Sequence, residues 1–291
     1  MKSLLGILFT GLVLLVIVIS CGESWVNQAT FYPRKGSEVD IDRLPPSIKH
    51  FFIPTEDGEQ LSSFYVRGDS SNKTILYFHG NAGNASGRLS AAVALSRFHS
   101  NVLLIDYRGY GLSSGSPSEN GIYTDGRAAL NYLVNDLQVE PSTIFLYGRS
   151  LGSAVAVEVA NDLPLAGLIL VTPISSGKQV AEHAGYGSLA SLIGTPFNNL
   201  EKLAGVNLPT LIIHGDRDEV LPLEMGQALQ DVAPAGTRLI VVPGAGHNNI
   251  DMINRTKYYR DIDEFCTEVL LGREVDDKTG TFELDENHTP I

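Results

Sequence analysis

Two Gly-x-Ser-x-Gly patterns occur in this chain, and the serine of each is a candidate nucleophile. Ser150 lies in GRSLG (148–152), directly after the apolar run TIFLY and directly before a helical pattern. A sharp turn from a strand into a helix exposes a serine hydroxyl and aims the helix N-terminus at it. Ser113 lies in GLSSG (111–115), inside a Gly- and Ser-rich stretch where no helical pattern begins. The surroundings therefore favour Ser150, and we interpret Ser113 as a loop residue.

A serine hydroxyl needs a base to remove its proton, and the base needs a group that orients it. His247 follows an apolar run in VVPGAGHNNI, and Asp218 follows the preceding run in IIHGDRDEVLP. The order serine, aspartate, histidine suits a strand-to-helix nucleophile turn. Asp216 is the alternative orienter. His79 and His214 also follow predicted strands, and we expect them to hydrogen-bond neighbouring loops.

Acyl transfer to a serine also develops a negative oxygen, and each donor fixed toward that oxygen is worth ~3–4 kcal/mol. The backbone N–H of Leu151 lies at the predicted helix start and is the first candidate donor. YFHGNAGN (77–84) follows an early apolar run, and the N–H of Asn81 within it is the second. This chemistry needs no metal and no organic cofactor, and no pair of Cys or His residues has the spacing of zinc ligands.

Six apolar runs of strand length alternate with helical patterns along the chain. Runs that are apolar on both sides are typical of parallel strands covered by helices on both faces. Residues 51–66 instead predict a hairpin that turns at Asp57-Gly58. The fold class is therefore α/β, with a mostly parallel, doubly wound sheet whose carboxyl edge carries the chemistry. Helices are expected at about 86–98, 121–136, 150–161, 222–231 and 254–271.

The N-terminus begins with an apolar segment in which Lys2 is the one charged residue. Its uncharged run from Leu4 to Ile19 is short for a spanning helix, which needs ~20 residues. The sequence VISCG resembles the bacterial lipobox and predicts cleavage before Cys21, followed by acylation of that cysteine. The alternative is an uncleaved anchor with an incidental cysteine. Either interpretation attaches the protein to a membrane, and a lipoprotein would carry its domain outside the cytoplasm.

Charge and cysteine content limit the partners. The net charge is −12 and no Lys/Arg cluster interrupts it, which argues against nucleic-acid binding and against electrostatic binding to anionic lipid. The chain has two cysteines, so lipidation of Cys21 leaves Cys266 without a disulfide partner. Cys266 shares an apolar helix face and is expected to be buried.

The chain divides into four predicted parts. These are a signal peptide or anchor at 1–20, a spacer at 21–49, a domain at 50–271 with a short cap at about 174–207, and an acidic tail at 272–291.

Five motifs, FHGNAGN, DYRGYG, YGRSLG, HGDRDEVLP and GAGHNN, closely resemble the α/β-hydrolase superfamily in sequence and in order. More narrowly, the chain is similar to membrane-anchored α/β-hydrolase-domain proteins, some of whose eukaryotic members remove palmitoyl groups from proteins. The resemblance covers about 50–271. It implies a triad of Ser150, Asp218 and His247, with Asn81 and Leu151 as the oxyanion donors.

The resemblance also bears on the pocket. It implies an architectural role for DYRGYG, in which we expect Asp106 and Arg108 to pair at the pocket floor. The cap is small, which suits bulky or membrane-embedded acyl groups. Four of its side chains either line an acyl pocket or pack the cap onto the body: Tyr186, Leu189, Leu192 and Phe197.

The sequence therefore predicts a membrane-anchored serine hydrolase that cleaves a carboxylic ester or a thioester, with a soluble or lipidic acyl substrate. A serine peptidase on the same fold is one alternative. It would need acidic groups in the cap to hold a peptide amine, and Glu182 alone offers little support. A catalytically silent, anchored binding protein is the other.

Overall fold

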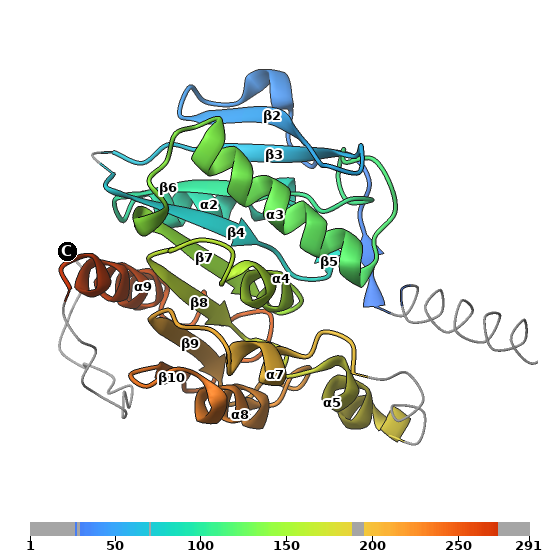
Figure 1. The fold of residues 1–291 in the computed structure, drawn as a ribbon, viewed down its shortest axis with the longest axis vertical. Coiled ribbons are helices and arrows are strands. Elements are labelled where there is room, and N and C mark those ends of the chain that lie inside the picture. The colour runs from blue at the N-terminus through green and yellow to red at the C-terminus, as the bar shows by residue number, and fades with distance from the viewer. Residues whose placement is uncertain (1–26, 28–29, 70, 188–194, 273–291) are drawn as a thin grey trace, which may run out of the picture.

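An eight-stranded sheet runs through the computed structural model, which describes residues 27, 30–69, 71–187 and 195–272 (Figure 1). Its strand order is β10-β9-β8-β7-β4-β6-β3-β2. Strand β3 is antiparallel to both of its neighbours, and the remaining pairs in the sheet are parallel. The predicted α/β class with a mostly parallel sheet is confirmed. The strands are β2 (Ile48–Pro54), β3 (Gln60–Val66), β4 (Lys73–Phe78), β6 (Ser100–Ile105), β7 (Ile144–Arg149), β8 (Gly167–Val171), β9 (Thr210–Gly215) and β10 (Arg238–Val242).

Helices cover both faces of the sheet, and the alternation of strand residues explains how. Leu76 and Phe78 of β4 pack into the core beneath α3, α4 and α8, whereas Ile75 and Tyr77 pack beneath α2 and α9. Successive side chains of a strand point to opposite faces, so an apolar strand supplies two cores. The α-helices are α2 (Leu89–Ser96), α3 (Glu119–Asn135), α4 (Gly152–Val159), α5 (Gly177–Ala181), α7 (Asn199–Leu203), α8 (Leu223–Val232) and α9 (Arg255–Leu270).

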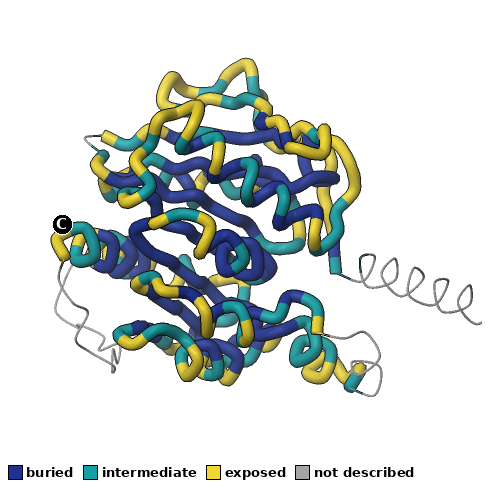
Figure 2. Tube along the Cα trace, viewed as in Figure 1, coloured by how far each residue is buried: buried dark blue, intermediate teal, exposed yellow. Residues whose placement is uncertain are grey.

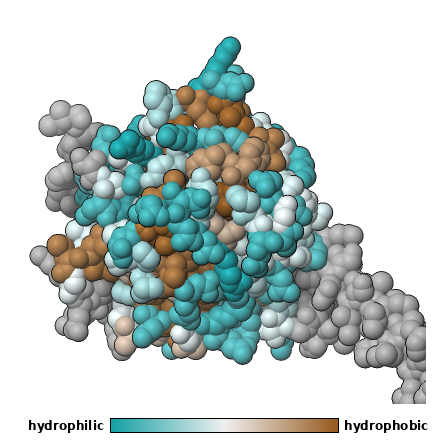
Figure 3. Space-filling model, turned by 45° about the horizontal axis from the view of Figure 1, so that its top comes forward, coloured by the Kyte–Doolittle hydropathy of each residue, from teal (hydrophilic) through white to brown (hydrophobic). Residues whose placement is uncertain are grey.

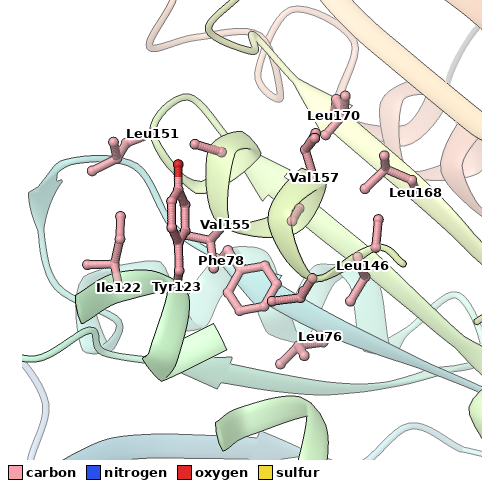
Figure 4. Packing of buried hydrophobic residues seen from close by; sticks show 14 of the residues in the cluster. Leu76, Phe78, Ile122, Tyr123, Leu146, Leu151, Val155, Val157, Leu168 and Leu170 are labelled. Carbon is pink, nitrogen blue, oxygen red and sulfur yellow. The ribbon is translucent and has the colours of Figure 1, made fainter. Parts of the chain in front are cut away.

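Helix α4 lies unusually close to its neighbours because small residues face them. A Cβ on Gly126 of α3 would lie 2.5 Å from a methyl group of Val155 on α4. Ala154 and Ala156 are fully buried. Figure 4 shows Val155 and Phe78 together in this core, and Figure 2 shows α4 and the central strands as the most deeply buried part of the chain. The close packing fixes the helix whose N-terminus follows Ser150.

The elements follow the sequence patterns with two informative differences. The hairpin of β2 and β3 turns at the expected place, where Gly58 has a φ of +92°. The helix expected at 86–98 divides into a short 3-10 turn, η2 (Ser86–Arg88), and α2. The helix expected from residue 150 begins at Gly152 instead, because Ser150 has a φ of +53° and is not helical. Further short turns are η1 (Ile41–Arg43), η3 (Pro141–Thr143) and the π-helical η4 (Glu182–Tyr186).

The described part of the segment 21–49 lies against the domain instead of forming a simple spacer. Phe31 is buried in the core, and β1 (Tyr32–Pro33) pairs with β5 (Ala82–Gly83) in a separate small sheet. The amide of Asn84 donates to the backbone carbonyls of Arg34 and Gly36, at 3.2 and 3.0 Å. We call residues 30–36 the strap. Backbone atoms of the strap make its hydrogen bonds to the loop, so its side chains need no regular hydrophobic pattern.

The cap is attached through Phe197, which is buried and has a φ of +53°. Its ring meets Phe31 edge to face at 6.2 Å, so Phe197 packs the cap onto the body and does not line a pocket. Tyr186 is exposed. The segment 1–20, Cys21, Leu189, Leu192 and the tail beyond residue 272 lie outside the described residues. Cys266 is buried in α9 as predicted.

No helix within the described ranges is both long and apolar enough to cross a membrane.

The expected pairing of Asp106 with Arg108 is wrong. Arg108 instead holds Asp125 of α3, with its Nε 2.9 Å from Oδ1, and Asp57 of the hairpin, with its Nη1 2.7 Å from Oδ2. Asp125 is fully buried and needs a cation beside it. Asp106 accepts the N–H of Ala85 at 2.7 Å. Burial raises the pKa of Asp125 to about 6, and the hydrogen bonds from Arg108 oppose that rise.

Replacing Arg108 should destabilise the fold strongly. Arg108→Met leaves the buried Asp125 carboxylate without its partner, and we expect the free energy of unfolding at pH 7 to fall by about 3 kcal/mol. The matched control is Arg127→Met, which removes a pair between half-exposed Arg127 and Glu158 and should change stability by less than about 1 kcal/mol. Urea unfolding measures both, and equal losses in the two variants would contradict the assignment.

Candidate active site

Ser150 occupies a strained turn between β7 and α4. Its φ of +53° lies in the left-handed region, which costs a non-glycine residue of order 1–3 kcal/mol and persists where the surroundings fix it. Here the N–H of Ser150 donates to the carbonyl of Val171 on β8 at 2.9 Å, and its carbonyl accepts the N–H of Ser153 at 2.9 Å. The turn lifts the hydroxyl beyond the carboxyl edge of the sheet.

The two glycines of the motif are required by contact. A Cβ on Gly148 would lie 2.5 Å from the carbonyl oxygen of Gly152, across the turn. A Cβ on Gly152 would overlap the carbonyl group of Phe78 at the end of β4. The turn therefore brings α4 so close to β4 that only glycine, which has no Cβ, fits at these two positions.

The structure brings Ser150, His247 and Asp218 into one hydrogen-bonded line. The Nε2 of His247 lies 3.0 Å from the Oγ of Ser150. The Nδ1 of the same ring lies 2.8 Å from Oδ2 of Asp218. The three residues follow β7, β10 and β9, which lie within four neighbouring parallel strands, so their side chains meet at the carboxyl edge of the sheet. Both distances are within the range of strong hydrogen bonds.

Asp218 is held as an ionised acceptor. Its Oδ1 accepts the N–H groups of Val220 and Leu221 at 2.9 and 2.8 Å, which leaves Oδ2 for His247. Burial by itself would raise the pKa of Asp218, but hydrogen bonds from His214, His247 and the N–H of Leu221 outweigh it and hold the pKa below its usual range. A carboxylate in this state favours the Nδ1–H tautomer of the histidine.

The alternative orienter and the other strand-end histidines bond loop backbone groups, and the Nε2 of His214 also lies 3.5 Å from Oδ2 of Asp218. Asp216 accepts the N–H of Gly244 at 2.6 Å, so Asp218 is the carboxylate at His247. His214 is buried with its Nε2 2.8 Å from the carbonyl of Leu221. His79, described below, also bonds a loop carbonyl. The expectation that both histidines bond neighbouring loops is confirmed.

A residue that sequence reasoning missed, Arg149, reaches the histidine loop from beside Ser150. Its Nη2 donates to the carbonyl of His247 at 3.2 Å, and its Nη1 lies 3.4 Å from Oδ1 of Asp251. The side chain of Arg149 is mostly buried. It therefore links the serine turn to the loop that carries the histidine. Only the position of a charged residue inside GRSLG hinted at this contact.

The two expected oxyanion donors lie on either side of the serine. Leu151 follows Ser150 at the start of α4. Gly80, which precedes Asn81, is close enough that a Cβ on it would touch the Cβ of Ser150 at 3.4 Å. Within the described ranges, the backbone N–H groups of Asn81 and Leu151 have no hydrogen-bond acceptor. Both donors are therefore available to a ligand oxygen.

The strap and a tyrosine hold the loop that carries Asn81. The carbonyl of Asn81 accepts the hydroxyl of Tyr110 at 2.7 Å and the N–H of Tyr32 at 3.3 Å. The side-chain amide of Asn81 donates to the carbonyl of Thr30 at 2.8 Å. Because its carbonyl and side chain are both engaged, the peptide of Asn81 has a fixed direction. We call residues 80–85 the oxyanion loop.

A buried pair of titratable groups lies beneath the oxyanion loop. The Nδ1 of His79 lies 2.6 Å from the carbonyl of Gly80, and its Nε2 lies 3.7 Å from Oδ1 of Asp106. Burial lowers the pKa of His79 to about 4 and raises the pKa of Asp106 to about 7. The imidazole is therefore neutral at pH 7, and its Nδ1–H donates to Gly80.

Comparison with known proteins identifies the family of this chain. Alpha/beta hydrolase domain-containing protein 17C of Mus musculus is 34% identical over 226 residues, covering 77% of this chain and 69% of that protein. The chain belongs to the α/β-hydrolase superfamily. A family model described as "Serine aminopeptidase, S33" matches residues 69–201 of this α/β hydrolase.

Two further likenesses extend over most of the chain. An uncharacterized protein of Mycobacterium tuberculosis is 36% identical over 260 residues, covering 88% of this α/β hydrolase and 92% of that protein. Among solved structures, the esterase Pf2001 of Pyrococcus furiosus aligns with a TM-score of 0.68 at 20% identity, over 82% of this chain and 99% of the esterase. This second likeness shows the α/β-hydrolase fold.

The close approach at Gly152 gives a stability prediction. Gly152→Ala should lower the free energy of unfolding by about 3 kcal/mol, because the added methyl group overlaps the backbone of β4. Gly205→Ala is the control, since its Cβ would find its nearest neighbour at 3.5 Å. Thermal and urea unfolding compare the two variants. A stable Gly152→Ala protein would mean that α4 can move away from β4.

Asp106 gives a pH prediction. Because its folded pKa of about 7 lies above the usual value of 3.8, the unfolded chain loses this proton first as pH rises. This carboxyl therefore lowers stability progressively between about pH 4 and pH 7. In Asp106→Asn that contribution is absent. We expect the stability of the wild type, relative to the variant, to decline across this window in urea unfolding. A constant difference would contradict the raised pKa.

Proposed function

We propose that this α/β hydrolase is a serine hydrolase that cleaves carboxylic esters or thioesters. The observation that carries the proposal is the hydrogen-bonded line from Ser150 through His247 to Asp218. The Ser150 hydroxyl in this line is flanked by two backbone N–H groups that have no acceptor among the described residues. A nucleophile, its base, the orienter of that base and an oxyanion site are the parts that acyl transfer requires.

In the proposed acylation, the Nε2 of His247 takes the proton of the Ser150 hydroxyl as Oγ attacks the acyl carbonyl carbon. Asp218 stabilises the imidazolium that forms. The N–H groups of Asn81 and Leu151 donate to the carbonyl oxygen as it becomes negative. The tetrahedral intermediate then collapses, the bond to the alcohol or thiol breaks, and His247 returns the proton to that leaving group.

In the proposed deacylation, a water molecule takes the place of the leaving group. His247 removes a proton from this water as its oxygen attacks the acyl-enzyme. The second tetrahedral intermediate uses the same two backbone donors. When it collapses, the carboxylic acid leaves and the proton on His247 returns to Ser150, so the enzyme is regenerated without any cofactor.

Three observations favour an ester or thioester over a peptide. Glu182, the cap carboxylate considered for holding a peptide amine, is half-exposed and lies 4.0 Å from Lys178. Glu119, near the cap, accepts the N–H of Phe197 at 2.7 Å. The structural neighbour Pf2001 is titled an esterase. The description "Serine aminopeptidase, S33" keeps a peptidase as the second candidate.

We also propose that the N-terminus attaches the domain to a membrane. This rests on the sequence alone: the apolar run from Leu4 to Ile19 and the lipobox-like setting of Cys21. Acylation of Cys21 after cleavage would supply more than one acyl chain, which is sufficient for stable anchoring. An extracytoplasmic domain belongs to the same proposal.

A fluorophosphonate probe tests the serine. Wild type should be labelled and Ser150→Ala should not, while Ser113→Ala, the matched serine of the second Gly-x-Ser-x-Gly, should be labelled like wild type. Assays on p-nitrophenyl esters of graded acyl length and on amino-acid p-nitroanilides would then separate esterase from peptidase. Failure of the folded wild type to react would favour the silent binding protein.

The orienting carboxylate has its own signature. Asp218→Asn should lower kcat on a p-nitrophenyl ester by about 10⁴-fold, because the amide no longer fixes the histidine tautomer or stabilises the imidazolium. Asp216→Asn, which alters the neighbouring carboxylate bonded to Gly244, is the control and should retain most activity. Equal losses of kcat in the two variants would contradict the assignment of Asp218 as the orienter.

A further inference from the structure

The chain enters the fold at the active site. The carbonyl of Thr30 accepts the side chain of Asn81 at 2.8 Å, and the N–H of Tyr32 donates to the backbone of the same residue at 3.3 Å. Strand β1 then pairs with β5 of the oxyanion loop. In Figure 1 the N-terminal end of the described chain accordingly lies beside β5. Anything attached ahead of the strap leaves the domain at the edge that carries Ser150.

The chain ahead of the strap is short. The apolar run ends at Ile19, so the connection to Thr30 spans at most about 40 Å when fully extended. A domain of this size is about 45 Å across. A membrane-attached N-terminus therefore keeps the active-site edge, rather than the opposite edge, close to the bilayer.

Exposed apolar side chains concentrate at this same edge. Of the ten large hydrophobic residues that are exposed in the described ranges, six belong to the strap, the cap or the loops that follow β6, β9 and β10. Met252 is 66% exposed and Val220 52%. The other four lie elsewhere, on the outer strand β2 and at or just beyond the C-terminal ends of α3, α8 and α9. We call the six the apolar rim: Tyr32, Leu112, Tyr186, Val220, Met252 and Ile253.

The loops of the apolar rim are tied to the site and to one another. Met252 and Ile253 follow Asp251, which pairs with Arg149 beside the serine. Val220 follows Asp218, and the preceding carbonyl of Glu219 lies 3.3 Å from the Nε2 of His183 in the cap. The strap meets the loop of Leu112 through a bridge between Lys35 and Gly111. The rim residues therefore lie on segments that adjoin the turn of Ser150 or one another.

On the face in Figure 3, hydrophobic residues form patches among hydrophilic ones. The net charge of −12 disfavours anionic lipid. The exposed apolar side chains instead suit the interface of a zwitterionic bilayer, because the free energy of binding to such a bilayer scales with the apolar area that is buried.

We propose that the apolar rim docks on a zwitterionic phospholipid bilayer and presents Ser150 to acyl groups held in that bilayer. The docking stands on the placement of the strap and the rim. The substrate class, an ester or thioester resident in the membrane, rests in addition on the proposed function.

Bilayer contact is measured first, with the full chain in phosphatidylcholine vesicles. The chain has one tryptophan, Trp25, and Trp25→Phe provides a silent background. Met252→Trp in that background should lose at least half of its fluorescence to lipids brominated along the acyl chains. Leu137→Trp, a matched exposed position beyond the far end of α3, should lose less than a tenth.

Turnover is measured second, as the ratio between a long-chain ester embedded in the vesicles and a short-chain soluble ester. Removing two rim side chains with Met252→Ser and Ile253→Ser should lower this ratio on the order of tenfold, because less apolar surface holds the site at the interface. The double variant Leu137→Ser with Val232→Ser removes two exposed apolar side chains elsewhere and should keep the wild-type ratio.

The outcomes separate the two proposals. Absent quenching at position 252, or an unchanged ratio in the rim variant, overturns the docking. Chemical cross-links between two chains through the rim, without quenching, would assign it to a second copy and overturn it as well. Wild type that is inactive on the soluble ester contradicts the proposed function instead, and quenching would still report docking.

Discussion

Helix α4 meets the end of strand β4 at a separation that only Gly152 permits, and the rest of the site depends on this contact. The close approach leaves Ser150 no room for helical geometry, so the residue takes a φ of +53°. Its hydroxyl is thereby raised above the sheet, and Leu151 follows it at the start of α4. Small residues on α3 and α4 transmit the constraint into the core, since larger ones would move the helix away.

Polar groups placed beneath the serine maintain the remaining geometry. Arg149 joins the serine turn to the carbonyl of His247, and Asp218 uses one carboxylate oxygen for the backbone and the other for the imidazole. The hydroxyl of Tyr110 likewise fixes the loop of Asn81 by donating to its carbonyl. Each of these bonds is buried or nearly so, where an unmade bond is costly. Movement of the serine turn, the histidine loop or the oxyanion loop would break these hydrogen bonds, and this holds the site in place.

Patterns that repeat along the chain were predictable, and contacts between distant backbones were not. Strand-length apolar runs and the motif around Ser150 gave the sheet, the turn and the three residues that meet there, because periodicity and glycine spacing are local signals. The strap was interpreted as a spacer because its bonds to the oxyanion loop are made by backbone atoms, which leave little trace in residue type. The partners of Arg108 and Arg149 were not predicted for a related reason. A charged residue in the sequence indicates that it needs a partner of opposite charge, but not which residue that partner is.

The strap joins the oxyanion loop through the hydrogen bonds of Thr30 and Tyr32 with Asn81. A force that pulls on the N-terminus therefore acts first on the hydrogen bonds to Asn81 and only then on the sheet. Thermal motion of whatever the N-terminus is fixed to would act on an oxyanion donor rather than on an inert surface loop. In this molecule the bonds that hold the strap also hold the peptide of Asn81, so the proposed tether would be mechanically part of the catalytic apparatus proposed above.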